Sequence, residues 1–141
     1  MPTARTLRRS SSARVLLGAF LASALAGAAQ ADDLCGRWTG TWKSCTDQFQ
    51  GTVNAKITRI DATHYKAVFT GRAFKIMPYR YTSILTVCRD EATGKTRFKA
   101  SQKLPIWGCY WVNGAADGCT FFARYRTDDH TGYFRMQRVS R

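Results

Sequence analysis

Residues 51–88 read GTVNAKITRIDATHYKAVFTGRAFKIMPYRYTSILTVC, and this stretch decides the fold class. From Thr52 to Thr58 polar and apolar residues alternate one for one, and the same alternation returns between Tyr79 and Cys88, where Ile84 is the exception. A period of two places successive side chains on opposite faces of a strand. The link at residues 61–63 is a short turn. The stretch therefore predicts half-buried strands whose neighbours run antiparallel.

The rest of the chain after residue 35 repeats this pattern, and no window shows the helical spacing i, i+3, i+4, i+7. Eight antiparallel strands in sequence order form a meander, and closing it into an up-and-down β-barrel removes the exposed edges. A two-sheet β-sandwich is the alternative; the barrel is favoured because no long crossover is visible. The predicted strands are Gly36–Ser44, Gly51–Ile60, His64–Phe74, Tyr79–Cys88, Lys95–Lys103, Trp107–Val112, Cys119–Arg126 and Gly132–Val139.

The N-terminal residues have the three parts of a secretory signal peptide. Four arginines and no acid occur in the first fourteen residues, an apolar run covers 15–29, and small residues form an A-x-A site at 29–31. The apolar run is shorter than the roughly 20 residues that span a bilayer. We therefore expect residues 1–31 to be cleaved and residues 32–141 to form one exported domain, periplasmic or secreted.

The chain is strongly basic, with 22 Lys and Arg against 9 Asp and Glu and a net charge of +13. The basic residues lie mainly on predicted strands and interleave with aromatic ones, as in residues 121–126, FFARYR. Inside a cell this mixture would suggest single-stranded nucleic acid. Export argues against nucleic acid as a partner. It favours anionic cell-surface polymers or lipids, attracted by a field that salt screens.

Gly36-Arg37-Trp38, at the start of the first strand, resembles the G-x-W signature of the calycin superfamily, which contains the lipocalins and avidins. The chain is also similar to small exported bacterial proteins. The calycin resemblance implies an eight-stranded barrel that binds a small ligand at its open end, and it assigns Ser44 to the ligand. Gly40 replaces an asparagine expected there, which argues against biotin. The resemblance also implies that Arg135 or Arg138 packs over Trp38 in a barrel-closing cation–π contact.

Four tryptophans and Ser44 are the candidate ligand-binding residues. Trp38 and Trp42 are four residues apart and share a strand face, as do Trp107 and Trp111. Such pairs are suited to stacking on a flat ligand or a sugar ring in the barrel mouth. The alternative is that these rings only fill a small interior.

Five cysteines lie in the exported domain, where structural disulfides form. Cys109 and Cys119 flank an expected hairpin turn around Asn113-Gly114, so we predict a disulfide between them. Either Cys35 or Cys45 is then the partner for Cys88, and the odd count leaves one thiol over.

The sequence contains no G-x-S-x-G motif, no H-E-x-x-H motif and no phosphate-binding glycine loop. His64 and His130 fall in predicted turns or strand ends, and residues 128–130 (DDH) are interpreted as an acidic turn rather than a metal site. We therefore predict no catalytic residues, no metal and no cofactor. The expected function is a small exported β-barrel binding module for an apolar, aromatic or saccharide ligand. The alternative is a basic, envelope-associated structural protein that binds anionic polymers or lipids.

Overall fold

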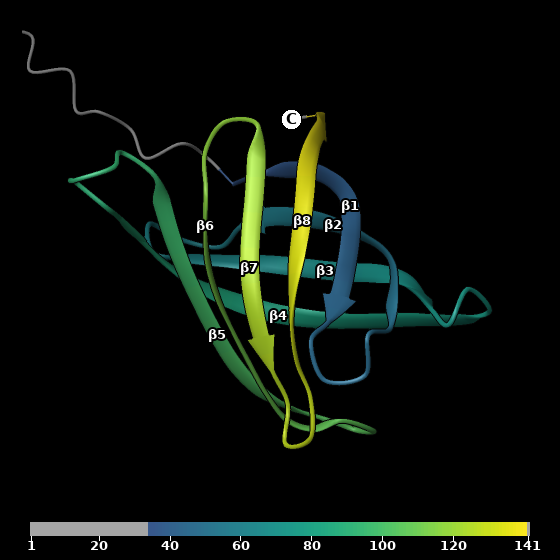
Figure 1. Cartoon of the computed structure of the whole chain (residues 1–141). Coiled ribbons are helices and arrows are strands. Elements are labelled where there is room, and N and C mark those ends of the chain that lie inside the picture. Colours follow the sequence, from purple (N-terminus) through teal and green to yellow (C-terminus); the bar gives the residue numbers. More distant parts are fainter. Residues whose placement is uncertain (1–33, 141) are drawn as a thin grey trace, which may run out of the picture.

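The computed structural model describes residues 34–140, so the predicted signal peptide lies outside the described residues. The eight strands form one closed antiparallel barrel in sequence order, with β8 paired to β1 (Figure 1). The predicted barrel is confirmed and the sandwich alternative is wrong. The strands are β1 Gly36–Ser44, β2 Gln50–Arg59, β3 His64–Ala73, β4 Met77–Arg89, β5 Thr96–Leu104, β6 Gly108–Ala116, β7 Thr120–Arg126 and β8 Thr131–Ser140.

Alternation along each strand decides which side chains face the interior. On β2, Val53, Ala55 and Ile57 are almost fully buried, while the polar residues between them are exposed. Ile84 and Phe122 are apolar but lie on outward positions of β4 and β7, and they are 46% and 38% exposed. The alternation along the strand outweighs the hydrophobicity of these two side chains, because turning either one inward would turn every other side chain of its strand to the opposite face.

The predicted Cys109–Cys119 disulfide is wrong. Strand β6 continues through Asn113-Gly114 to Ala116, so Cys109 lies at one end of the barrel and Cys119 beyond the other. Seven strand steps between Cys109 and Ala116 span roughly 23 Å. The turn is set instead by Asp117, whose carboxylate accepts hydrogen bonds from the backbone N–H groups of Cys119 and Thr120 at 2.8 and 2.7 Å. The thiols of Cys109 and Cys119 are both free and exposed.

One end of the barrel is plugged by the start of the described chain. Leu34 is fully buried, and its carbonyl accepts a hydrogen bond from the Trp38 indole N–H at 3.0 Å. The Arg138 guanidinium lies 4.3 Å from the centre of the Trp38 ring and donates to the Gly118 carbonyl at 2.7 Å and to the Cys35 carbonyl. Arg138 thus ties three segments together and closes this end.

The turns β1–β2, β3–β4, β5–β6 and β7–β8 all lie at the opposite end, because each odd-numbered strand runs toward it. Between residues 34 and 140 no helix is long and apolar enough to cross a membrane.

Candidate ligand-binding cavity

A cavity of about 130 Å³ opens at the end of the barrel opposite Trp38. Nine of its fifteen lining residues are aromatic. They are Trp42, Phe49, Phe74, Tyr79, Tyr81, Trp107, Tyr110, Tyr125 and Phe134. The other six are Ser44, Asp47, Ala73, Leu104, Thr127 and His130. A ligand here would meet ring faces and edges on nearly every side.

Five rings form a closed circle around the barrel interior, and we call them the aromatic belt: Phe69, Tyr81, Tyr110, Tyr125 and Phe134. Phe69 stacks with Tyr81 and Phe134 at centroid distances of 5.1 and 6.0 Å. Tyr125 stacks with Phe134 at 5.0 Å and with Tyr110 at 6.3 Å. Tyr110 meets Tyr81 edge to face at 5.5 Å. These separations are those of favourable aromatic pairs, so each ring holds its neighbours in place.

Glycines opposite the larger rings make room for them. Tyr125 is paired across strands with Gly132, as Trp42 is with Gly51 and Tyr79 with Gly71. A methyl group on Gly132 would lie 2.5 Å from the Tyr125 ring and within clashing distance of a backbone carbonyl. The absent side chains let these rings pack against the barrel wall.

The hydroxyl groups of the cavity stay neutral. Burial raises the pKa of Tyr81 and Tyr110, and their hydroxyl groups are hydrogen-bonded to each other at 3.1 Å. Burial also raises the pKa of Tyr125 to about 12, against the opposing effect of a hydrogen bond from Ser44. The phenols therefore carry no negative charge, and the Tyr81–Tyr110 pair uses one of its two O–H donors internally.

One half of the mouth is fastened by polar contacts between the β1–β2 and β7–β8 loops. The imidazole Nε2 of His130 lies 2.8 Å from the Asp47 carboxylate. The Thr131 N–H donates to the Thr46 hydroxyl at 3.1 Å. The Ser44 hydroxyl accepts from the N–H groups of Thr46 and Asp47 at 3.2 and 3.3 Å. Ser44, which the calycin resemblance assigned to the ligand, mainly orders this loop.

The backbone ladder between β4 and β5 is short. These strands pair only from Thr86 to Arg89, so the mouth-side part of β4 has no ladder to β5. Beyond that ladder, the Ser83 hydroxyl donates to the Gln102 side-chain oxygen at 3.1 Å. The Ser83–Gln102 hydrogen bond therefore links the two strands where the backbone ladder is absent.

The structure separates the predicted ligand-binding residues. Trp42, Ser44 and Trp107 line the cavity. Trp38 does not, because it is 1% exposed in the plugged end. Trp111 does not either, because it lies on an outward position of β6 with the Arg126 guanidinium 4.5 Å from its ring centre.

The calycin resemblance left open whether Arg135 or Arg138 packs over Trp38, and the two side chains lie in different places. Arg138 packs over Trp38, whereas Arg135 faces outward and lies 5.6 and 5.3 Å from the Phe122 and Tyr133 ring centres. The candidate ligand-binding residues predicted from the sequence did not include the four cavity tyrosines, Tyr79, Tyr81, Tyr110 and Tyr125. Two features of the sequence could have identified them. Each tyrosine occupies an inward position in the alternation of its strand, and glycines are paired across strands with Tyr79 and Tyr125.

Charge is segregated between strands and turns. Of the 17 Lys and Arg residues within 34–140, 15 lie on strands, whereas all seven acids lie in turns. The acids are Asp47, Asp61, Asp90, Glu91, Asp117, Asp128 and Asp129. The outer wall is therefore basic, and on β6–β8 its cations stack on exposed rings such as Trp111.

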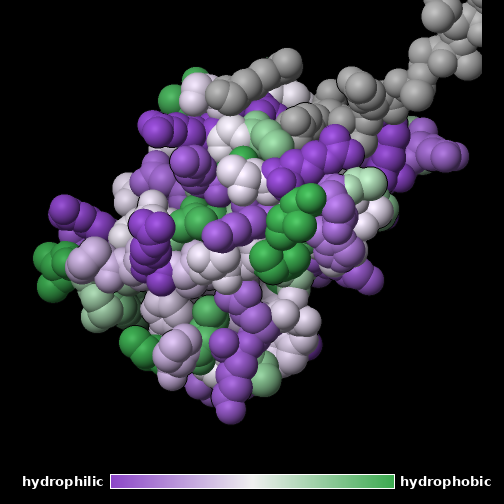
Figure 2. All heavy atoms as spheres, turned by 180° about the vertical axis from the view of Figure 1, so that it is seen from behind, coloured by the Kyte–Doolittle hydropathy of each residue, from purple (hydrophilic) through white to green (hydrophobic). Residues whose placement is uncertain are grey.

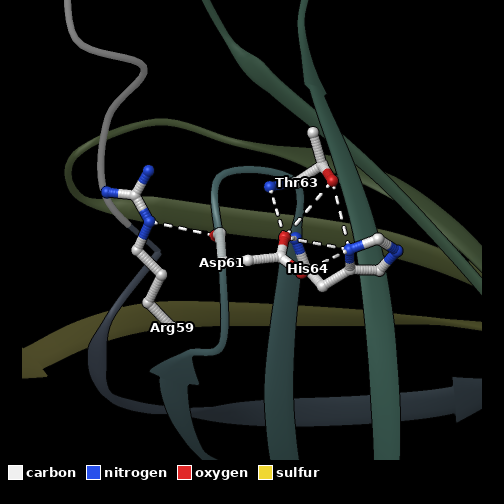
Figure 3. Close-up of polar contacts among 4 residues, drawn as sticks. All are labelled: Arg59, Asp61, Thr63 and His64. Carbon is white, nitrogen blue, oxygen red and sulfur yellow. Dashed lines mark hydrogen bonds and ion pairs between the residues drawn. The ribbon is translucent and has the colours of Figure 1, made fainter.

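His64 lies in a cluster of polar contacts with Asp61 and Thr63 at the β2–β3 turn (Figure 3), at the end of the barrel opposite the cavity. The Asp61 carboxylate accepts from the N–H groups of Thr63 and His64, both at 2.8 Å, and these bonds, led by that from Thr63, lower its pKa. The Thr63 hydroxyl and this carboxylate both contact the same imidazole nitrogen, Nδ1. In a catalytic relay the two ring nitrogens of the histidine contact different partners. We therefore interpret this cluster as a set of hydrogen bonds that stabilises the β2–β3 turn. No group of three or more His, Cys, Asp or Glu side chains that could hold a metal ion occurs among the described residues.

No protein-family model and no curated protein matches this chain. Among solved structures, it is similar to a de novo designed fluorescence-activating β-barrel, with 16% sequence identity and a TM-score of 0.53. The match covers 74% of this chain and 91% of the designed one. At this identity the likeness concerns the fold, an eight-stranded antiparallel barrel. These comparisons do not confirm the calycin resemblance.

Proposed function

We propose that this protein is an exported, non-catalytic binding module that holds a small aromatic or apolar ligand in the cavity at the open end of the barrel. The observation that carries this proposal is the aromatic belt, four of whose five rings line a cavity that opens to the outside. A barrel of this kind supports binding because its rings are held in place by one another before any ligand arrives. The proposal of export rests on the signal peptide pattern at residues 1–31.

The size and polarity of the cavity narrow the ligand. A cavity of about 130 Å³ is close to the engineered protein cavity of roughly 150 Å³ that accepts benzene. One ring of a ligand fits inside, and any larger part projects from the mouth. Most polar groups nearby already have protein partners: Tyr81 with Tyr110, and Asp47 with His130. A flat apolar ligand therefore suits the site better than a saccharide.

Filling the cavity tests the proposal. Ala73 lines the cavity and is 5% exposed, so Ala73→Phe puts a ring where the ligand would lie. Thr82→Phe adds the same ring to an exposed outward position of β4 and is the matched control. Calorimetric titration with phenol and indole should show binding to the wild type and the control, and none to Ala73→Phe. Native mass spectrometry of protein purified from its source should show a bound small molecule. A chain that is always empty and binds neither probe would refute the proposal.

The hydroxyl variants Tyr81→Phe and Tyr110→Phe distinguish the two ligand classes. They keep the rings and remove the hydrogen-bonded pair. An apolar ligand should bind them about as well as the wild type, whereas a saccharide should bind more weakly because it loses polar partners.

A second candidate function rests on the charge segregation of the outer wall. We propose that this wall binds anionic polysaccharide, with Arg126 and Trp111 as a stacked cation and ring on its surface. Binding to heparin as a probe should weaken as salt rises, because the attraction is electrostatic. Arg124→Ser combined with Arg126→Ser should weaken it further. Retention on heparin that is independent of salt, or absent at low salt, would remove this candidate.

A further inference from the structure

The rim of the open end carries the most exposed large apolar side chains of the described chain. Ile76, in the β3–β4 turn, is 80% exposed, and Ile106, in the β5–β6 turn, is 83% exposed. Met77 and Trp107 beside them are 52% and 39% exposed. Both turns project at the open end of the barrel (Figure 1), and Figure 2 shows hydrophobic and hydrophilic residues together at the left edge, where the β3–β4 hairpin ends.

The β3–β4 turn adopts a backbone that its residues disfavour. Phe74 and Lys75 have φ angles of 55° and 64°, in the left-handed region where glycine and asparagine are preferred. The turn thus holds a bulky residue and a cation in a strained conformation and presents Ile76 to the outside. Strain of this kind is concentrated at functional segments.

Cations lie near both apolar turns of the rim. Lys75 lies in the β3–β4 turn, and Arg72 and Lys103 lie close to the two apolar turns on β3 and β5. The acids of the rim lie in the β1–β2 and β7–β8 loops, where Asp47 contacts His130 and Asp128 accepts a hydrogen bond from the Cys109 N–H at 3.1 Å. Asp128 thus reaches the start of β6, where a hydrogen bond engages its carboxylate, whereas Lys75, Arg72 and Lys103 lie close to the two turns that carry the exposed isoleucines.

We propose that the β3–β4 and β5–β6 turns dock this protein on an anionic lipid bilayer, with Ile76 and Ile106 inserted among the acyl chains. Single apolar side chains on separate convex turns suit a soft medium, whereas a protein partner would need a continuous complementary patch. Lys75, Arg72 and Lys103 then lie at the level of the anionic headgroups. Trp107 lies at the boundary, which tryptophan prefers.

Docking in this orientation turns the open end of the barrel toward the bilayer. The two inserted turns also flank the separation between β4 and β5, since they begin β4 and end β5. Docking does not depend on what the cavity holds, so the two proposals fail separately.

The test is flotation of the exported chain with vesicles of phosphatidylcholine alone or mixed with phosphatidylglycerol. The double variant Ile76→Ser/Ile106→Ser removes the two inserted side chains. Ile84→Ser/Val139→Ser is the matched control, because these apolar side chains are 46% and 63% exposed on the barrel wall and strand end. We expect the wild type to bind the mixed vesicles. Relative to the wild type, binding should fall at least about fivefold in the rim variant and less than about twofold in the control.

Two further measurements test the contribution of Lys75 and the depth of Trp107 in the bilayer. Lys75→Ser should weaken binding to mixed vesicles, whereas Lys95→Ser, in the β4–β5 turn at the plugged end, should leave it unchanged. Brominated lipids should quench the emission of the wild type, and Trp107→Phe should remove most of that quenching. Unfolding curves of every variant check that the fold is retained.

The outcomes that overturn the proposal are equally specific. They are an absence of vesicle binding at low salt, equal binding of the rim variant and the wild type, and equal loss in the rim variant and the wall control. Binding that depends on Arg124 and Arg126 rather than on the isoleucines would show that the wall, not the rim, contacts the lipid.

Discussion

Replacing Arg138 by methionine should lower the free energy of unfolding by about 3 kcal/mol. The guanidinium donates to two backbone carbonyls, of Gly118 and Cys35, and a hydrogen bond from a charged donor contributes roughly 1.5–3 kcal/mol. Its position 4.3 Å from the Trp38 ring centre adds about 1 kcal/mol. Because the site is only part-buried and the contributions are not additive, the sum is reduced to the stated figure. Methionine keeps an apolar stem over the indole.

Arg135→Met is the matched control on the same strand. Arg135 also lies over two rings, Phe122 and Tyr133, but it faces outward and is exposed. Its replacement should cost less than about 0.5–1 kcal/mol. Urea unfolding followed by circular dichroism measures both values, and the melting temperature of the Arg138 variant should fall by roughly 10–20 °C. Equal effects of the two replacements would refute the assignment of Arg138 as the residue that closes the plugged end.

Three further predictions concern packing and titration. Gly132→Ala should destabilise the barrel by about 1–3 kcal/mol, because the methyl group meets the Tyr125 ring and a backbone carbonyl, while Gly118→Ala, which meets nothing within 4 Å, should be neutral by thermal melting. The folded chain should show less phenolate absorbance than the urea-unfolded chain near pH 11, because burial raises the pKa of Tyr125 to about 12. Between an unfolded pKa of about 10 and the folded value, only the folded state keeps this proton. The free energy of unfolding should therefore fall as the pH rises through this range. Hydrogen bonds from Cys119 and Thr120 lower the pKa of Asp117, so its contribution is present above an unfolded pKa of about 3.9 and is lost at lower pH; Asp117→Asn should flatten the acid limb of a stability-against-pH curve.

The sequence predicted most of the fold because the information is local. Alternation with a period of two assigns each side chain to the interior or the exterior, and turn residues separate the strands. The same alternation would also have distinguished Arg138 from Arg135 as the residue that packs over Trp38. Arg138 shares the inward phase of Phe134 and Met136, whereas Arg135 has the outward phase.

The cavity depended on information that is not local. Trp38 and Trp42 share one face, but the closed barrel places them roughly 13 Å apart along the strand, one in the plug and one at the cavity. Trp107 and Trp111 also appeared equivalent, yet Trp107 lies in a turn, where the alternation stops. The disulfide prediction failed for a related reason, since it depended on where β6 ends.

What the sequence by itself determined was the strand order and the inward or outward direction of nearly every side chain, because backbone geometry sets both over a few residues. The tertiary structure decided the depth of each residue in the barrel, the plugged and open ends, and the five-ring belt. These depend on the stagger between strands, and in particular on the pairing of β1 with β8, whose residues are far apart in the sequence. Only closure of the barrel brings Phe69, Tyr110 and Phe134 into one circle.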